Sequence, residues 1–212
     1  MQFSPLKLVT KISLLFLIFS LFPATSLASS FNPNNLISDE ELTDTSTMSL
    51  GEIQTFLNRG FLGNYVTEDI DGKNRYASAV IWRAATRNGI NPKVILVMLQ
   101  KEQSLVLDDS PSQSQLDWAM GYAVCDSCNH RDPNIQRWKG LAKQVNSSTL
   151  QLVEGYLADL QSNGETVAGY APGRTTTIDN TIVTPANNAT AALYTYTPHI
   201  HGNSNFVKLW QD

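Results

Sequence analysis

The chain has 212 residues, with 19 Asp and Glu against 15 Lys and Arg, and 42% of its residues are hydrophobic. This length is enough for one domain with a single core. The net charge of −4 offers no basic surface, which argues against nucleic acid as a partner and against electrostatic attraction to anionic wall polymers.

The first 28 residues have the pattern of a secretory signal. Lys7 and Lys11 precede an apolar run over 12–19, and Ser26-Leu27-Ala28 supplies small residues at the cleavage site. We expect cleavage after Ala28, which takes the net charge to −6. An uncleaved anchor is the alternative, disfavoured because the run is short for a bilayer span. No later stretch is apolar for long enough to cross a membrane, so we expect a secreted or cell-envelope protein, periplasmic or extracellular.

The two cysteines, Cys125 and Cys128, lie close together in the sequence. In an exported protein such a pair is most simply a disulfide. A redox-active pair would be expected at the start of a helix after a strand, and no strand is predicted there. A metal site would need more ligands than these two and His130. We predict a disulfide, no metal and no cofactor.

The chain is expected to begin its ordered part near residue 48. Residues 29–47 are polar without periodicity and predict a flexible leader. Ser49 and Glu52 then fit a capping box, which predicts a short helix ending near Arg59. After a loop, a second helix is expected over 74–88.

The stretch 89–107 predicts a central helix. Asn91 can cap it, and Pro92 suits the first helical position. One face is apolar at a spacing of three and four residues: Val94, Ile95, Met98, Leu99, Leu105 and Val106. Glu102 lies within this stripe, where removal from water favours the protonated form and suits a general acid. The alternative is that Glu102 reaches solvent or pairs with a Lys or Arg.

The rest of the chain is predicted to be mostly helical. A polar loop leads to Trp118 and Tyr122, which either pack in the core or stack on a sugar ring. Helices are expected over 131–162 and 185–196, with a short helix near the end. Between them, 175–184 predicts a β-hairpin with Asp179-Asn180 at its turn. The predicted fold class is mainly α with one small β-hairpin.

Four short stretches together resemble the lysozyme-like superfamily, in its soluble lytic transglycosylase and goose-type lysozyme branch. They are Gly89-Ile90-Asn91-Pro92, Gln100-Lys101-Glu102-Gln103-Ser104, Ala119-Met120-Gly121 and Ala192-Leu193-Tyr194-Thr195-Tyr196-Thr197-Pro198. The resemblance covers about 76–198. It implies a lysozyme-like helical domain, which we place over 48–212.

The resemblance also implies roles for individual residues. Glu102 takes the place of the catalytic acid, and Tyr196 that of a tyrosine beside it. The substrate-binding set is Gln103, Ser104, Trp118, Met120, Gly121, Tyr122, Tyr194 and Tyr196. This chain departs from the family where Gln103 replaces the usual Ser, where Tyr122-Ala123-Val124 replaces Leu-Met-Gln, and where Thr197-Pro198 replaces Asn-Ala.

The implied activity is cleavage of the β-1,4 bond between N-acetylmuramic acid and N-acetylglucosamine, with Glu102 as general acid and then base. A lytic transglycosylase needs that one carboxylate. A hydrolytic lysozyme is an alternative that would need a second group to position water, and a non-catalytic peptidoglycan-binding module is another. The expected partner is the glycan strand of peptidoglycan, bound by a monomer.

Overall fold

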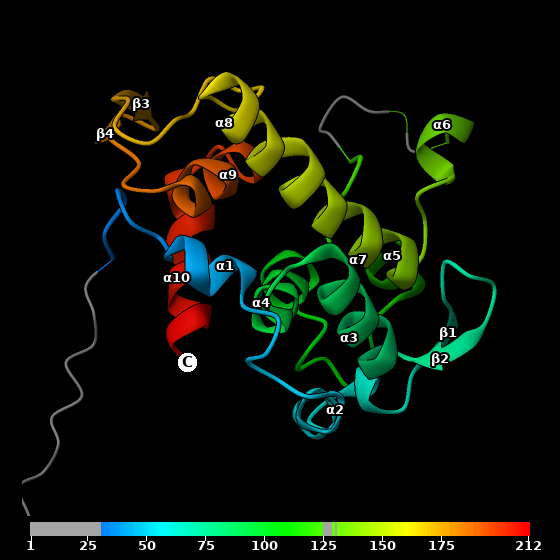
Figure 1. Cartoon of the computed structure of the whole chain (residues 1–212). Coiled ribbons are helices and arrows are strands. Elements are labelled where there is room, and N and C mark those ends of the chain that lie inside the picture. Colours follow the sequence, from blue (N-terminus) through cyan, green and yellow to red (C-terminus); the bar gives the residue numbers. More distant parts are fainter. Residues whose placement is uncertain (1–30, 125–128, 130) are drawn as a thin grey trace, which may run out of the picture. The chain divides into compact units, whose positions relative to one another are not determined.

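The computed structural model describes residues 31–124, 129 and 131–212, and helices predominate in this part of the chain (Figure 1). The prediction of a mainly α domain is confirmed. In chain order the elements are α1 (Asp39–Thr43), α2 (Leu50–Leu57), the 3-10 helix η1 (Phe61–Gly63), β1 (Val66–Glu68), β2 (Asn74–Tyr76), α3 (Ala77–Asn88), α4 (Pro92–Gln103), α5 (Gln113–Asp117), α6 (Pro133–Gln136), α7 (Leu141–Leu150), the π-helix η2 (Gln151–Leu157), α8 (Ala158–Asn163), β3 (Thr176–Ile178), β4 (Thr181–Val183), α9 (Asn188–Tyr196) and α10 (Ile200–Gln211).

Helix α4 is a largely buried helix of the domain. It begins as predicted, because the Asn91 side chain accepts a hydrogen bond from the Lys93 N–H and Pro92 occupies the first turn. All six residues of 94–99 are at most 5% exposed, with Leu96 and Val97 at the edge of a hollow. The helix ends at Ser104, which adopts a left-handed conformation with φ of 58°.

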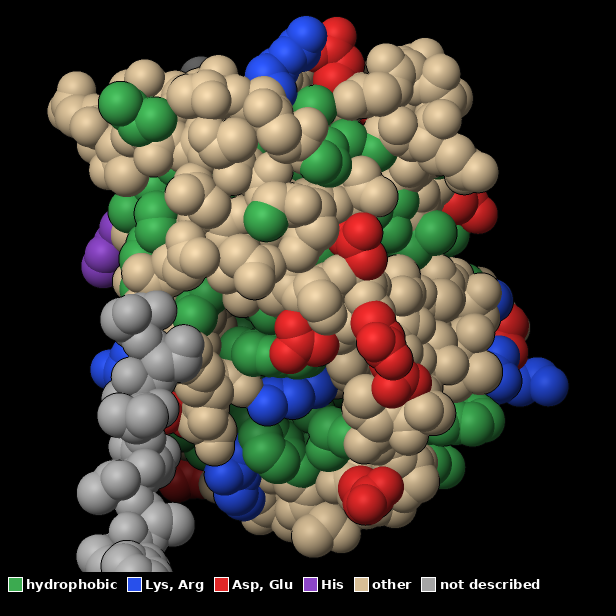
Figure 2. Space-filling view, turned by 60° about the vertical axis from the view of Figure 1, so that its left-hand side comes forward, with side chains coloured by type: hydrophobic (Ala, Val, Ile, Leu, Met, Phe, Trp, Pro, Cys, Tyr) green, Lys and Arg blue, Asp and Glu red, His purple; other side chains and the backbone are tan. Residues whose placement is uncertain are grey.

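Neighbouring helices surround α4. Helices α3 and α10 both pack against it, and α3 in turn packs against α2 and α7. A hollow remains between α2, α4 and α10. Figure 2 shows one face of the molecule, where hydrophobic and basic side chains lie around a depression in the lower half, with acidic side chains beside them. The neighbouring helices therefore cover one side of α4 less completely than the others.

Helices α7 and α8 form one continuous rod with the π segment between them (Figure 1). The residues at both junctions, Gln151 and Ala158, keep right-handed helical dihedral angles. The rod ends at Gly164 with φ of 77°, close to the end of the helical stretch expected over 131–162. Helices of the π type are rare in proteins, but those that occur often lie at functional sites. The stretch 151–157 is therefore a candidate to border such a site.

The structure contains two β-hairpins within the described residues. The predicted hairpin is confirmed: β3 pairs antiparallel with β4, and the turn residues Asp179 and Asn180 both have positive φ, as a two-residue turn requires. A second hairpin, β1 with β2, was expected to be a loop and a helix start. Its strands have three residues each, too few for an alternating pattern to stand out.

An ion-pair network fixes the β1–β2 hairpin to α3. The Asp69 carboxylate, 3% exposed, lies 3.0 Å from both Arg75 and Arg83. Asp71 binds the same two guanidinium groups, and its hydrogen bond from Arg75 lowers the pKa of Asp71 to about 2.

The leader expected over 29–47 differs from the structure from residue 31 onward. Ser38 and Glu41 form a capping box that starts α1, and Leu42 is fully buried. The Asn91 side chain also donates to the Glu41 carbonyl, which attaches α1 to the start of α4. The capping box was visible in the sequence, but a five-residue helix gives no measurable periodicity. The predicted signal, 1–28, lies outside the described residues.

Among the residues that the structure describes, no helix has the length and apolar character needed to cross a bilayer.

Gly60 lies where the chain after α2 meets the chain after α4. A Cβ at this position would lie 2.6 Å from the Val106 carbonyl oxygen, a backbone atom that cannot rotate away. We therefore expect Gly60→Ala to lower the free energy of unfolding by about 1–3 kcal/mol, measured by urea denaturation. The matched control is Gly51→Ala, since a Cβ there meets nothing within 4 Å and α2 gains helix propensity. Equal effects of the two substitutions would contradict the steric argument.

Candidate functional site

Glu102 lies in the last turn of α4 and is paired. Its side chain is 25% exposed, and its Oε1 atom lies 2.5 Å from Nζ of Lys101. Lys101 is 7% exposed and also donates to the Thr197 hydroxyl at 2.9 Å. Thr197 follows α9, so this cluster joins the end of α4 to the end of α9.

This ion pair is the alternative that the sequence left open for Glu102. A general acid must carry a proton in its resting state. Protonation of Glu102 would leave the nearly buried Lys101 ammonium without its counter-ion, which is costly. The contact therefore gives Glu102 a structural role as the counter-ion of Lys101.

The loop after α5 comes close to Glu102. Gly121 has φ of 70°, and a Cβ built on it would lie 3.4 Å from Oε2 of Glu102. A side chain at this position would be strained by the backbone conformation, and its Cβ would be in van der Waals contact with the carboxylate. The structure thus brings together two of the predicted site residues.

Gln144 of α7, a residue that the sequence analysis did not single out, holds this loop. It is fully buried, and its side-chain oxygen accepts from the backbone N–H groups of Met120 and Tyr122. Its amide nitrogen donates to the carbonyls of Tyr122 and Trp138. One side chain thus satisfies four backbone groups. The sequence feature that could have identified Gln144 is the presence of a polar Gln on the buried face of a predicted helix.

Tyr196 attaches the end of α9 to the same loop. Its hydroxyl donates to the Met120 carbonyl at 2.7 Å, so the Ser148 hydroxyl, 2.8 Å away, donates to the Tyr196 oxygen. Burial raises the pKa of Tyr196, and the nearby Glu102 charge adds to this increase. The predicted proximity of Tyr196 to Glu102 agrees with the structure, whereas Ser148 was missed.

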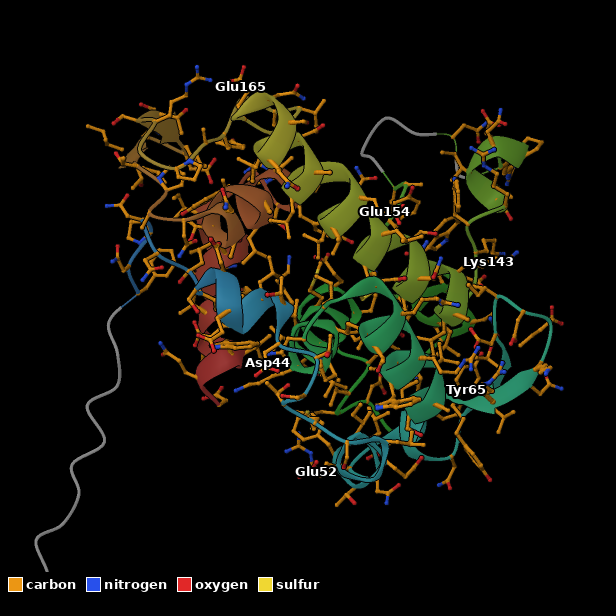
Figure 3. All side chains as sticks on the ribbon, viewed as in Figure 1. Asp44, Glu52, Tyr65, Lys143, Glu154 and Glu165 are labelled. Carbon is orange, nitrogen blue, oxygen red and sulfur yellow. The ribbon has the colours of Figure 1, made fainter. Side chains whose placement is uncertain are left out.

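Aromatic side chains border this cluster. The Tyr122 ring packs edge-on against Trp138, with ring centroids 5.2 Å apart. Tyr156 comes from the π segment; burial raises its pKa, and Tyr122 contributes to the increase. Glu154 of the same segment is exposed, and Figure 3 shows it on the long rod between α7 and α8. We call Glu102, Lys101, Gly121, Tyr122 and Tyr156 the α4-end site.

Other predicted binding residues have structural roles. Tyr194 is fully buried and its hydroxyl donates to the Pro33 carbonyl, so the expectation that it binds substrate is corrected: it is a core residue. Burial raises the pKa of Tyr194 to about 12. Trp118 and Met120 are buried as well, at 8% and 0% exposure. Ser104 is the exposed C-cap of α4, and the Gln103 carbonyl accepts from the Gln115 side chain.

The predicted disulfide between Cys125 and Cys128 lies outside the described residues, as does His130. Within the described part of the chain, no group of three His, Cys, Asp or Glu side chains could hold a metal ion.

A comparison with protein families assigns the chain differently from the sequence resemblance. The family model described as "LasA, N-terminal domain" matches residues 35–206, which is most of the chain. No curated protein and no solved structure matches the chain. LasA is a secreted, peptidoglycan-cleaving staphylolytic peptidase, and it is not a lytic transglycosylase.

The lysozyme-like assignment and the glycosidase mechanism derived from it were therefore wrong. The match extends over the whole stretch that carried the resemblance, 76–198. The Lys101–Glu102 ion pair gives an independent physical reason, because it opposes the protonated acid that the mechanism required. The expected connection with peptidoglycan and with secretion fits what is known of LasA.

The ion pair makes a prediction for stability. Glu102→Gln should lower the free energy of unfolding by about 1–3 kcal/mol, because the Lys101 ammonium loses its counter-ion. Adding Lys101→Met should recover part of that loss. A double-mutant cycle in urea denaturation is expected to give a coupling energy of about 1–3 kcal/mol.

The control pair for this cycle is Glu165 and Arg174, which are also ion-paired but 43% and 57% exposed. Their coupling should stay below about 1 kcal/mol, because water screens exposed pairs. A coupling at Lys101 and Glu102 no larger than the control would show that the pair does not hold the site together.

Proposed function

This chain belongs to the family of LasA N-terminal domains, and on that premise we propose that it is a non-catalytic domain of an exported protein that binds the glycan strand of peptidoglycan. The α4-end site is the binding surface. Binding the polymer raises the local concentration of any peptidase joined to the domain, without new contacts between the peptidase and its substrate.

One observation carries this proposal: the Lys101–Glu102 pair lies beside Gly121, on a loop that Gln144 fixes and that carries the partly exposed Tyr122. Sugars expose hydroxyl groups, which pair with charged acceptors and donors, and apolar ring faces, which pack on aromatic side chains. Sites that bind small ligands combine such apolar walls with a few fixed polar groups. The polar groups of Gln144 and Tyr196 are bonded to the loop backbone, so these two residues position the loop and are not expected to contact the ligand.

We expect binding without cleavage, because the Glu102 side chain is already engaged by Lys101. The paired side chain can still accept a hydrogen bond from a sugar hydroxyl. The acidic chain gives no electrostatic attraction to anionic wall polymers, so we expect recognition of the glycan through hydrogen bonds and aromatic contact. The domain is expected to act outside the cytoplasm, as a monomer.

The test is co-sedimentation of residues 29–212 with purified peptidoglycan stripped of anionic polymers. We expect saturable binding, also to glycan strands from which an amidase has removed the peptides. Tyr122→Ala should weaken binding by about tenfold, equivalent to about 1.4 kcal/mol. The supernatant should contain no new reducing ends and no 1,6-anhydro sugars.

Tyr76→Ala is the matched control, because Tyr76 is a 54% exposed tyrosine on β2, outside the α4-end site. It should bind like the unaltered protein. Binding that survives Tyr122→Ala, or that disappears when the peptides are removed, would overturn the proposal. The latter result would identify the stem peptide as the ligand.

A further inference from the structure

The hollow between α2, α4 and α10 lies on the other side of α4 from Glu102. Lys93, Val97 and Gln100 repeat at helical spacing and face it, whereas Glu102 is two positions further and points about 200° away. The volume of the hollow is about 370 Å³, within the range of small-molecule sites. Its apolar lining consists of Met48, Phe56, Leu96, Val97, Val106, Leu107 and Leu209.

Two cations border this hollow without an anionic partner. The Arg59 guanidinium lies 3.8 Å from the centre of the Phe56 ring, and Lys93 Nζ lies 4.7 Å from the centre of the Trp210 ring. Neither forms a salt bridge with another described residue. Their rings stabilise them only weakly compared with a carboxylate. The acid in the lining, Asp212, is exposed and pairs with neither.

The wall of the hollow is built independently of any ligand. The Gln100 side-chain oxygen accepts hydrogen bonds from the backbone N–H groups of Val106 and Leu107. This contact fixes the turn after α4 against the helix. The Gly60 backbone also packs closely on this turn. A preformed wall lowers the ordering cost of binding.

We propose that this hollow binds a single-chain anionic amphiphile, an alkyl carboxylate whose chain packs on the apolar lining and whose carboxylate pairs with Arg59 and Lys93. The apolar lining gains free energy by covering methylene groups, about 0.8 kcal/mol for each one buried. A neutral chain would leave both cations without a counter-ion, and a small anion would leave the exposed part of the lining, such as Leu107, in contact with water. Only a ligand with both parts satisfies the two sets of residues together.

The experiment is isothermal titration of residues 29–212 with decanoate below its micelle concentration, at pH 7. We expect saturable one-to-one binding. The double variant Arg59→Gln/Lys93→Gln should weaken it by at least about tenfold, since it removes the groups that pair with the carboxylate. The control Lys73→Gln/Lys143→Gln removes the same charge from exposed positions elsewhere and should change the affinity by less than about twofold.

A second pair of measurements separates the chain from its head group. Leu209→Trp should abolish decanoate binding by filling the hollow, with the fold verified by circular dichroism. Decan-1-ol should bind the unaltered protein and the Arg59→Gln/Lys93→Gln variant equally. Non-saturable heats, equal loss in both double variants, or binding to anionic vesicles but not to monomeric decanoate would overturn the proposal.

Discussion

The burial of α4 on all sides is the constraint on which the rest of the structure depends. Six consecutive residues, 94–99, are buried, so the helix is stable only with neighbours around its whole circumference. Helices α3 and α10 supply two of these neighbours. At its start, Asn91 accepts a hydrogen bond from Thr47 and donates to the Glu41 carbonyl, so even the segment before α2 is organised by this helix.

The same burial explains the chemistry at the end of α4. Where the helix leaves the core, Lys101 is still 7% exposed and needs a counter-ion, which Glu102 supplies. A cation in the last turn also complements the helix dipole. The pair is thus a consequence of ending a buried helix near the surface, and Thr197 and Gly121 are arranged around it.

Local signals predicted much of the fold, because they depend on neighbouring residues only. The capping box of Ser49, the start at Pro92 and the Asp179-Asn180 turn are all present as expected. The β1–β2 hairpin and α1 were missed because three to five residues carry no periodicity. The π segment 151–157 gave no signal at all. In the site, the loop at 120–121 contacts both Tyr196 and Glu102, so these two residues lie near each other as expected. The role of Gln144 could not be predicted, because it depends on contacts between distant parts of the chain.

The wrong family assignment has a physical explanation in these same residues. A turn into a Pro-started helix, a charged pair where that helix leaves the core, and a buried tyrosine bonded to a backbone carbonyl are what a central buried helix requires. Any chain that solves this packing problem acquires similar short motifs, so their order indicates an architecture and not a reaction. The chemistry depends instead on what surrounds the carboxylate, and here Lys101 is paired with one of its two oxygens.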